Sequence, residues 1–313
     1  MVGYIRDKNG KVTHLPPLFS YRAEHGTGTP CDAFEISCRY VPKLEKALKN
    51  ACFFTGVYKG AVVFAGVVDE YEVEMGLSGL TLSVSGRGMA ARLLDNEAEA
   101  VIYGYCAPET VIRSYVSPFG IAVAEPEVKK TCSGFTVESG ESCWSAVYRY
   151  FRFVCGIKPR FSRDGTLLLR EAPGAKRSFD GENTVRAVRN ESRYGIVSEV
   201  FVRDANGRRV KTVRNGEFIE RGGSARRVLT LPRKPGFDYE RYTGEYIIEC
   251  SEEEKETWTL TAPEPFAAFP GDTAQVRLPE IGAVGMFRVI STESYESASG
   301  RGTEIRIIRG GDK

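Results

Sequence analysis

The chain has 313 residues, of which 42% are hydrophobic and 27% are charged, so it is long enough for two or three globular domains and too apolar to be disordered. Its net charge of +2, from 43 basic and 41 acidic residues, gives no overall reason to expect nucleic acid or an anionic membrane as a partner. The longest nearly uncharged apolar run, residues 60–68, is far too short to cross a bilayer, and the N-terminus lacks a signal-peptide core. We therefore expect a soluble protein that is synthesised in the cytoplasm.

Cysteine and histidine usage argues against a metal site. The two histidines, His14 and His25, lie near the start of the chain, and no CxxC pair is present, so the sequence offers poor material for zinc. The eight cysteines are Cys31, Cys38, Cys52, Cys106, Cys132, Cys143, Cys155 and Cys250. We interpret them as small buried hydrophobic residues in a reducing compartment.

The N-terminal third is predicted to be an arm followed by a β barrel. The arm, residues 1–29, includes a polar, proline-containing stretch at residues 8–17 that is typical of an arm or a loop. Cys31–Tyr40 alternates well enough to be the first full strand of a barrel over residues 30–104. The charged stretch Pro42–Asn50 predicts one or two helical turns on the rim of that barrel.

Three antiparallel strands form the centre of this predicted barrel: Phe53–Tyr58, Ala61–Val73 and Leu80–Ser85. Lys59-Gly60 has the glycine that a two-residue hairpin turn favours, because glycine adopts positive φ without a Cβ clash. In the third strand Leu and Val alternate with Thr and Ser, the period of a strand with one buried face.

Gly86-Arg-Gly88 then leads into a predicted short helix over residues 89–95. The unpaired amides at a helix start can bind phosphate, but the glycine spacing and the Lys-Ser/Thr of a P-loop are missing. We therefore prefer a tight exit from strand to helix, with phosphate binding as the alternative.

Residues 105–176 are predicted to form a compact α+β module. Pro108–Tyr115 can form a short helix with one apolar face. Glu141–Cys155 is the strongest helix in the chain, because its apolar residues recur at i, i+4, i+7, i+8 and i+11. A hairpin over residues 158–170 follows, and it turns at Asp164-Gly165.

Residues 177–313 are predicted to form a second β barrel. Ile196–Arg203 and Arg208–Val213 flank Ala205-Asn-Gly207, a strong hairpin signal. An aromatic and then acidic excursion near residues 234–257 is interpreted as an insertion. Basic residues gather around the hairpin: Arg208, Arg209, Lys211, Arg214, Arg226 and Arg227. A solvated strand face is the default interpretation of this cluster, and contact with an acidic partner surface is the alternative.

The hairpin pattern of the first barrel returns at the end of the chain. Residues 282–290 align with residues 60–68 at a shift of 222 positions, and residues 303–307 align with the strand that starts at Leu80 at a shift of 223. We interpret this as a degenerate internal duplication, with two β domains of similar plan at the two ends. Chance resemblance between hairpins is the alternative.

The sequence predicts no catalytic, cofactor-binding or metal-binding residue. A triad would need His14 or His25, whose segment is expected to be mobile, and the signatures GxSxG, HExxH and the dinucleotide fingerprint are absent. Asp69-Glu70 points to opposite faces of a strand, and the glutamate run at residues 252–256 is expected to be solvated. A glycosidase-like pair of distant carboxylates stays open.

Several stretches resemble the baseplate hub proteins of Mu-like contractile phage tails, a family related to the hub half of type VI secretion spike proteins. They are Phe64–Glu70, Leu80–Asp95, Tyr115–Ile121, the helix Glu141–Cys155 with Arg163–Leu167, Pro270–Val276 and Gly285–Ile290. The likeness extends from about Phe34 to Ile308. It implies a mainly β fold with a smaller α+β part, in which two tube-like antiparallel β barrels flank an α+β module.

The resemblance also implies a homotrimer without enzymatic activity or cofactor. Three chains with two barrels each present six nearly equivalent units to a sixfold tail tube protein, while the threefold axis suits a central spike protein. Tape measure and baseplate wedge proteins are further implied partners, and neither a membrane nor a specific nucleic acid is among them. The expected location is the tail baseplate of a virion.

Two other classes of function stay open. The first is an enzyme, a tail-associated peptidoglycan hydrolase. The second is a β-rich module that binds carbohydrate or nucleic acid, for which the arginines between Arg208 and Arg227 are the support.

Overall fold

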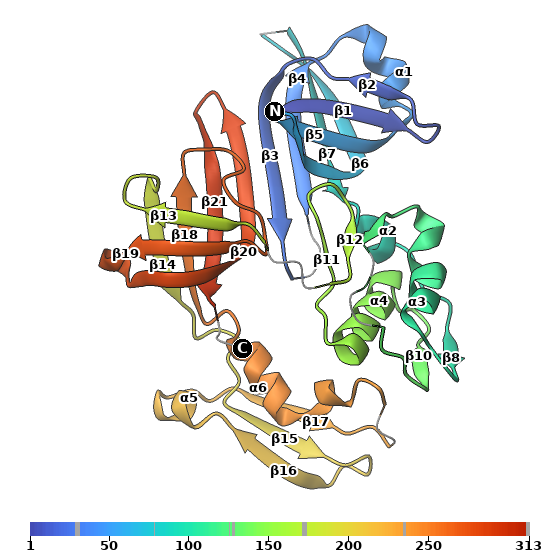
Figure 1. Ribbon diagram of the computed structural model, residues 1–313, viewed down its shortest axis with the longest axis vertical. Coiled ribbons are helices and arrows are strands. Elements are labelled where there is room, and N and C mark those ends of the chain that lie inside the picture. Colours follow the sequence, from blue (N-terminus) through green and yellow to red (C-terminus); the bar gives the residue numbers. More distant parts are fainter. Residues whose placement is uncertain are drawn as a thin grey trace.

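A computed structural model describes residues 1–28, 32–77, 79–124, 126, 129–170, 174–233 and 236–310. Two mainly antiparallel β units stand side by side, and an α+β module and a small mixed lobe lie below them in the view of Figure 1. The predicted fold class, mainly β with a smaller α+β part, is confirmed. In these described ranges no helix has the length and apolarity that crossing a bilayer requires.

The first β unit has its strands side by side in the order β3-β4-β7-β6-β5-β1-β2. Their bounds are β1 (Val2–Asp7), β2 (Val12–His14), β3 (Leu18–Gly26), β4 (Ala33–Arg39), β5 (Ala51–Tyr58), β6 (Ala61–Gly76) and β7 (Gly79–Gly88). The predicted helical turns are η1 (Pro42–Leu44) and α1 (Glu45–Leu48). Aromatic rings fill the core: Phe34 stacks on Phe54 with ring centroids 4.1 Å apart, and Phe64 packs against both.

The N-terminal segment is not the arm that we predicted. β1 pairs with β5 and β3 pairs with β4, so residues 1–28 belong to the sheet. Ile5 and Leu15 are each 1% exposed in the first core, and burying such a side chain stabilises the fold by about 1.5–3 kcal/mol. The strands here are short and interrupted at Gly10 and Pro16-Pro17, which leaves too little alternation for a strand prediction.

The second β unit has its strands in the order β14-β18-β21-β20, with β19 and β13 continuing beyond β20. Their bounds are β13 (Lys176–Asp180), β14 (Arg186–Glu191), β18 (Glu256–Ala262), β19 (Thr273–Leu278), β20 (Ala283–Ser297) and β21 (Gly300–Arg309). Trp258 is at the centre of its core, where it meets Phe287 edge-on at 5.0 Å.

The two units share one strand order. The path β3-β4-β7-β6-β5-β1 crosses the first unit, and the path β14-β18-β21-β20-β19-β13 crosses the second. When the six strands of each path are numbered in chain order, both paths read 2-3-6-5-4-1. The strand directions differ at one end, because β1 pairs antiparallel with β5 whereas β13 pairs parallel with β19. Apart from that last strand, the two ends of the chain have the same topology, as the repeat predicts.

The long hairpins of the two units carry the same β-bulge. The pairing slips by one residue at Asp69 in β6–β7 and at Ile290 in β20–β21. The closing pairs are Gly76↔Gly79 and Ser297↔Gly300. Bulge and turn therefore correspond at one shift of 221 positions (290 − 69 and 297 − 76). The predicted shifts of 222 and 223 are one and two residues too long, because matching apolar residues does not reveal an unpaired bulge residue.

The glycines at the end of β7 have a structural reason that replaces the phosphate alternative. A Cβ on Gly86 would lie 2.0 Å from the carbonyl oxygen of Val67, and one on Gly88 would lie 2.8 Å from the Cβ of Asp32. The backbone therefore needs glycine for close packing. The helix that follows is a single turn, α2 (Ala91–Leu94), which is too short to present a row of free amides.

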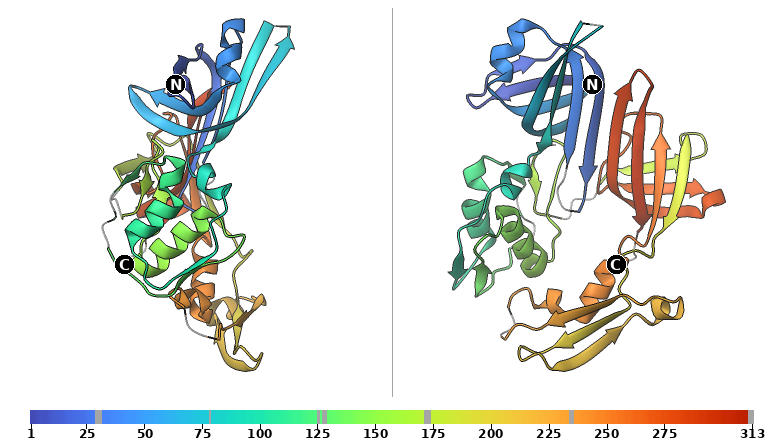
Figure 2. Two further views of the ribbon diagram at one scale, coloured as in Figure 1. Left: turned by 90° about the vertical axis from the view of Figure 1, so that its right-hand side faces the viewer. Right: turned by 180° about the vertical axis from the view of Figure 1, so that it is seen from behind.

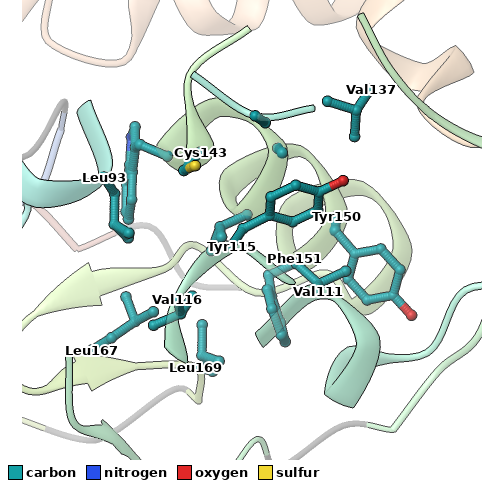
Figure 3. Close-up of a cluster of buried hydrophobic side chains, with 14 of the residues drawn as sticks. Leu93, Val111, Tyr115, Val116, Val137, Cys143, Tyr150, Phe151, Leu167 and Leu169 are labelled. Carbon is teal, nitrogen blue, oxygen red and sulfur yellow. The ribbon is translucent and has the colours of Figure 1, made fainter. Parts of the chain in front are cut away.

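The α+β module is close to its prediction. α3 (Pro108–Tyr115) has the predicted bounds, and α4 (Cys143–Tyr150) continues as the π-helical turn η3 (Phe151–Cys155) to the predicted end. Figure 3 shows Val111 and Tyr115 of α3 packed with Tyr150 and Phe151 in the module's core. Its other elements are β8 (Val101–Tyr103), η2 (Ser117–Phe119), β9 (Val123–Ala124), β10 (Phe135–Val137), β11 (Arg160–Phe161) and β12 (Leu167–Leu168).

A separate lobe contains the hairpin that we predicted for the second barrel. β15 (Glu199–Arg203), β16 (Arg209–Arg214) and β17 (Arg226–Thr230) form a sheet of their own, with α5 (Gly216–Glu220), η4 (Tyr239–Tyr242) and α6 (Gly244–Glu252). The predicted insertion supplies α6, whose Ile247 and Ile248 pack on Val200 and Val202. Strand alternation is the same in both sheets, so the sequence does not reveal which sheet a strand joins. The limits 30–104, 105–176 and 177–313 stay a proposal for the domains.

Candidate assembly interface

β3 of the first unit pairs with β20 of the second and joins both units into one sheet. The pairing is antiparallel and runs from Ser291↔Gly26 to Glu296↔Tyr21. Next to the bulge, the Thr27 amide donates to the carbonyl of Ile290 at 2.9 Å. We call this contact the β3–β20 junction. It shows how one edge of a first unit fits the hairpin of a second unit.

Side chains reinforce the β3–β20 junction on both faces of the sheet. On the polar face, Arg22 donates two hydrogen bonds to Glu293, at 2.8 and 2.9 Å. On the other face, Tyr21 stacks on Phe266 with ring centroids 5.7 Å apart, and the Phe266 amide donates to the Ser294 hydroxyl at 3.1 Å. The junction therefore combines backbone pairing, a bidentate ion pair and aromatic packing.

Both histidines lie in strands, which corrects the prediction that their segment is mobile. His14 on β2 meets Tyr4 edge-on at 5.1 Å. His25 on β3 lies between Phe64 and Phe269, at 5.3 and 5.4 Å. Burial lowers the pKa of His25 to about 4, so the ring is neutral at pH 7. No carboxylate of the described residues hydrogen-bonds to it, so the orienting partner of a catalytic triad is missing in this part of the chain.

Asp32 is a buried carboxyl next to the β3–β20 junction. Its Oδ1 accepts the Gly26 amide at 2.9 Å, and its backbone carbonyl accepts the Gly88 amide at 2.8 Å. Burial raises the pKa of this side chain to about 7. A raised pKa is also found at catalytic sites. Here, however, the hydrogen bonds of Asp32 tie the ends of β3 and β7 together, which is a structural role.

A cleft of about 400 Å³ lies where the two β units and the module meet. Its lining includes Tyr58, Lys59, Val63, Arg163, Arg177, Phe179, Glu264, Phe266 and Phe269. Lys59 forms an ion pair of 2.5 Å with Glu264, which links the β5–β6 turn to the segment after β18. Within the residues that the structure describes, no group of three His, Cys, Asp or Glu could hold a metal ion.

The glutamate run is not simply solvated, as we had expected. Glu253 pairs with Lys158 at 2.6 Å and with Arg288 at 3.4 Å. Glu254 pairs with Arg306 at 3.0 Å. These ion pairs link the end of α6 to the module and to β20 and β21, so the run connects three parts of the molecule.

The arginine cluster lies on the lobe, and part of it is used internally. The guanidinium groups of Arg209 and Arg226 lie 3.6 and 4.3 Å from the ring centroid of Phe201. Arg226 also pairs with Glu199 at 2.6 Å, and Lys211 pairs with Glu245. These contacts favour the default interpretation of a strand face over a nucleic-acid site.

Most of the described cysteines are at least partly buried, as we interpreted them. Cys38, Cys106, Cys143 and Cys155 are buried, Cys52 and Cys132 are half-buried, and Cys250 is exposed, all as free thiols. Cys31 lies outside the described residues. Burial raises the pKa of Cys38 to about 11, so this thiol is unreactive at neutral pH.

Sequence reasoning missed one exposed apolar feature, the tip of the β6–β7 hairpin. Val73, Met75, Leu77 and Leu80 are all exposed there, Met75 at 84%. In the left view of Figure 2 this hairpin extends beyond the rest of the first unit. The signal was present in the sequence, because a hairpin turn of the form Met75-Gly-Leu-Ser-Gly-Leu80 is apolar where polar residues are usual.

Solved structures of phage tail proteins share this fold. The chain is similar to the tail protein from Neisseria meningitidis MC58, with a TM-score of 0.74 and 19% identity over 97% of this chain and 95% of that one. It is similar to the 43 kDa tail protein of prophage MuSo2 from Shewanella oneidensis, with a TM-score of 0.76 and 18% identity over 99% and 98%.

A more distant likeness is to the E. coli c3393 protein, described as a component of the type VI secretion system that resembles T4 tail proteins. Its TM-score is 0.58 at 10% identity, over 94% of this chain and 74% of that one. No family model and no curated protein sequence matches the chain. At these identities the likenesses establish the fold, and the function is argued from the geometry.

Proposed function

We propose that this chain is a structural, non-catalytic component of a contractile tail: a baseplate hub that works as a homotrimer and joins a sixfold tail tube to a threefold central spike. The observation that carries the proposal is the strand order shared by the two β units. One chain offers two similar units, and three chains offer six. A threefold ring of copies then imitates sixfold geometry on one side and keeps threefold geometry on the other.

The β3–β20 junction supports this arrangement. It connects unequal units edge to edge without an intervening layer, so the sheet runs continuously through the chain. A ring closes when the same type of contact repeats with a constant rotation. Six units in a ring need six such contacts, three of which lie within the chains.

The face of the joined sheet that points away from both cores suits the wall of a water-filled channel. Its side chains alternate with buried ones such as Tyr21, Ile36 and Ile305. They include Arg22, Glu24, Glu35, Ser37, Ser83, Ser85, Glu293, Glu304 and Arg306. Four carboxylates and two guanidinium groups are mixed with hydroxyl groups there, so the proposed channel wall is polar with an excess of negative charge.

The proposed partners follow from this geometry. A tail tube protein would bind one rim of the ring, a central spike protein would bind the other, and tape measure and baseplate wedge proteins would meet the hub during assembly. The proposed location is the tail baseplate of a virion, after synthesis in the host cytoplasm, and neither a membrane nor a specific nucleic acid is a proposed partner. The similar tail and type VI secretion proteins support this setting.

Mass measurement of the purified chain tests the proposal. We expect a particle of three times the 34.6 kDa chain mass, and negative-stain images with six units around a threefold axis. A stable monomer at all concentrations, or a cell-wall zymogram with clearing that is lost on mutating one carboxylate, would overturn it. The expected combination is a trimer by mass and no clearing of the cell-wall zymogram by the chain or by its variants.

A further inference from the structure

Two edge segments of the joined sheet, one on β6 and one on β14, have a strand partner on one side only among the described residues. On β6, residues 70–75 pair with β7 on one side only, because the pairing with β5 ends at Val67. On β14, residues 186–191 pair with β18 on one side only. An edge of this kind presents unpaired N–H and C=O groups that favour the addition of another strand.

These two edges are the counterparts of the strands that form the β3–β20 junction. β6 corresponds to β20 at the shift of 221. β14 corresponds to β3 at a shift of 166 (187 − 21), because Ala187 faces Leu260 in β18 as Tyr21 faces Ile36 in β4. The chain thus contains both halves of a second junction that it cannot close by itself.

The exposure of side chains differs between the β3–β20 junction and the two edges on β6 and β14. Ser294 on β20 is 1% exposed, whereas its counterpart Val73 on β6 is 38% exposed. On the other edge, Val185 and Val188 are exposed at 71% and 36%. Apolar side chains are therefore exposed on both edges, together with Met75 at the hairpin tip.

We infer that β6 of one copy pairs antiparallel with β14 of a second copy of this chain, in the register of the β3–β20 junction. The inference rests on the proposed trimer and identifies its contact. Applying the two shifts to Glu293↔Glu24 gives Glu72↔Asn190, and applying them to Tyr295↔Arg22 gives Glu74↔Val188. Three such contacts between copies and three β3–β20 junctions within copies complete a ring of six units.

Charge supports this register. In the β3–β20 junction, Glu24 faces Glu293 directly. Arg22 lies two residues before Glu24, and the Arg22 guanidinium binds Glu293 diagonally across the two strands. In the inferred contact, Arg186 lies two residues before Val188, the residue that faces Glu74. Glu74 and Arg186 therefore have the same diagonal relation and would form the same kind of ion pair.

Backbone geometry makes the register directly testable by disulfide formation. Thr27 donates to the carbonyl of Ile290, so the alternate pair Glu24↔Glu293 is not hydrogen-bonded, and such pairs have Cα atoms about 4.5 Å apart. Disulfides need Cα atoms about 4.4–6.8 Å apart. The counterpart pair Glu72↔Asn190 is therefore placed to form a disulfide between copies, whereas the diagonal pair Glu74 with Asn190 is about 7–8 Å apart.

The experiment oxidises the full-length double variant Glu72→Cys/Asn190→Cys and measures the covalent species on a non-reducing gel. We expect a ladder that ends at three linked chains, with at least about tenfold less linkage for the matched control Glu74→Cys/Asn190→Cys. Each single variant shows the background from the native cysteines. Mass photometry of the same samples reports whether the copies associate.

The outcomes separate this inference from the proposed function. A trimer by mass whose Glu72→Cys/Asn190→Cys variant links no better than the control overturns the β6–β14 contact and leaves the trimer in place. A monomer by mass in the unmodified chain overturns both.

Charge reversal keeps the inference testable if the cysteine variants fold poorly. Glu74→Arg alone and Arg186→Glu alone are each expected to weaken association about fivefold, and the double variant is expected to restore it to within about twofold. Glu99→Arg, an exposed site on the module side, is the matched control and is expected to leave association unchanged. Equal weakening by both single variants without recovery in the double variant would contradict the register.

Discussion

The two β units share their topology but differ in what fills equivalent places. The second unit has hydroxyl residues inside its hairpin where the first has apolar ones: Thr303 corresponds to Leu82 and Ser294 to Val73 at the shift of 221. The Thr303 hydroxyl donates to the Glu264 carbonyl at 2.7 Å and accepts the Ala267 amide at 3.2 Å. These bonds hold the segment between β18 and β19 against the β3–β20 junction.

This difference shows how one plan serves two purposes. The hairpin of the second unit makes its contacts within the chain. Its buried hydroxyl groups fix a segment that packs Phe266 onto Tyr21 of the first unit. The hairpin of the first unit keeps apolar side chains exposed at the same level, including Val73 and Met75. The first hairpin is therefore the part that is free for a partner.

The largest effect on stability is expected at Gly86, where the two units differ: its counterpart in the second unit is the buried Ile307. A Cβ at this position would lie 2.0 Å from the Val67 carbonyl oxygen, so Gly86→Ala forces the two strands apart. We expect the free energy of unfolding to fall by at least about 4 kcal/mol, measured by urea denaturation. Gly76→Ala, on the same hairpin with nothing within 4 Å of the added methyl, is the control and should change stability by less than about 1 kcal/mol.

The next test compares Asp32 with Glu256, its counterpart at the shift of 224 that aligns Ile36 of β4 with Leu260 of β18. Glu256 pairs with Arg189 at 2.5 Å. Burial raises the pKa of Asp32 to about 7 from 3.8, so the folded chain holds this proton more tightly than the unfolded chain. The contribution of Asp32 to stability is therefore full below pH 4 and falls, by about 4 kcal/mol, as pH rises towards 7. Chemical denaturation of Asp32→Asn should lose that part of the pH dependence, and an unchanged slope would contradict the assignment.

A smaller effect is expected from Thr303→Val, which makes the second unit resemble the apolar first unit. The variant removes one donated and one accepted hydrogen bond of the segment between β18 and β19, at a cost of about 2 kcal/mol. Hydrogen exchange should show faster exchange of the Ala267 amide. Ser83→Ala, on the polar face of β7, is the control, and equal destabilisation by both variants would remove the proposed role of the hydroxyl.

The smallest effect is expected at the ion pair of the closed junction. Arg22→Ala removes the bidentate contact with Glu293, but both side chains are partly exposed, so the loss is at most about 1 kcal/mol. A double-mutant cycle with Glu293→Ala measures the coupling. A coupling above about 2 kcal/mol would mean that the pair matters more to the junction than its backbone pairing.

Local pattern and long-range pairing explain which parts were predictable. The helix α4 and the hairpins at Lys59-Gly60 and Asp164-Gly165 depend on neighbours in the sequence, and they were predicted. The N-terminal strands were missed because Ile5 and Leu15 are buried by distant residues. The lobe was misplaced because the partners of β15 are not encoded in its own alternation. The partner strand and the register of the candidate interface were out of reach for the same reason, since they depend on which edge strands lack a partner in the folded chain.

A near-atomic electron microscopy map of the assembled chain tests the central claim most directly. The account predicts three copies in a ring of six β units, with β3–β20 junctions inside copies alternating with β6–β14 contacts between them. A ring with another number of copies, or copies that meet through the lobe or the module while β6 and β14 stay free, would contradict it.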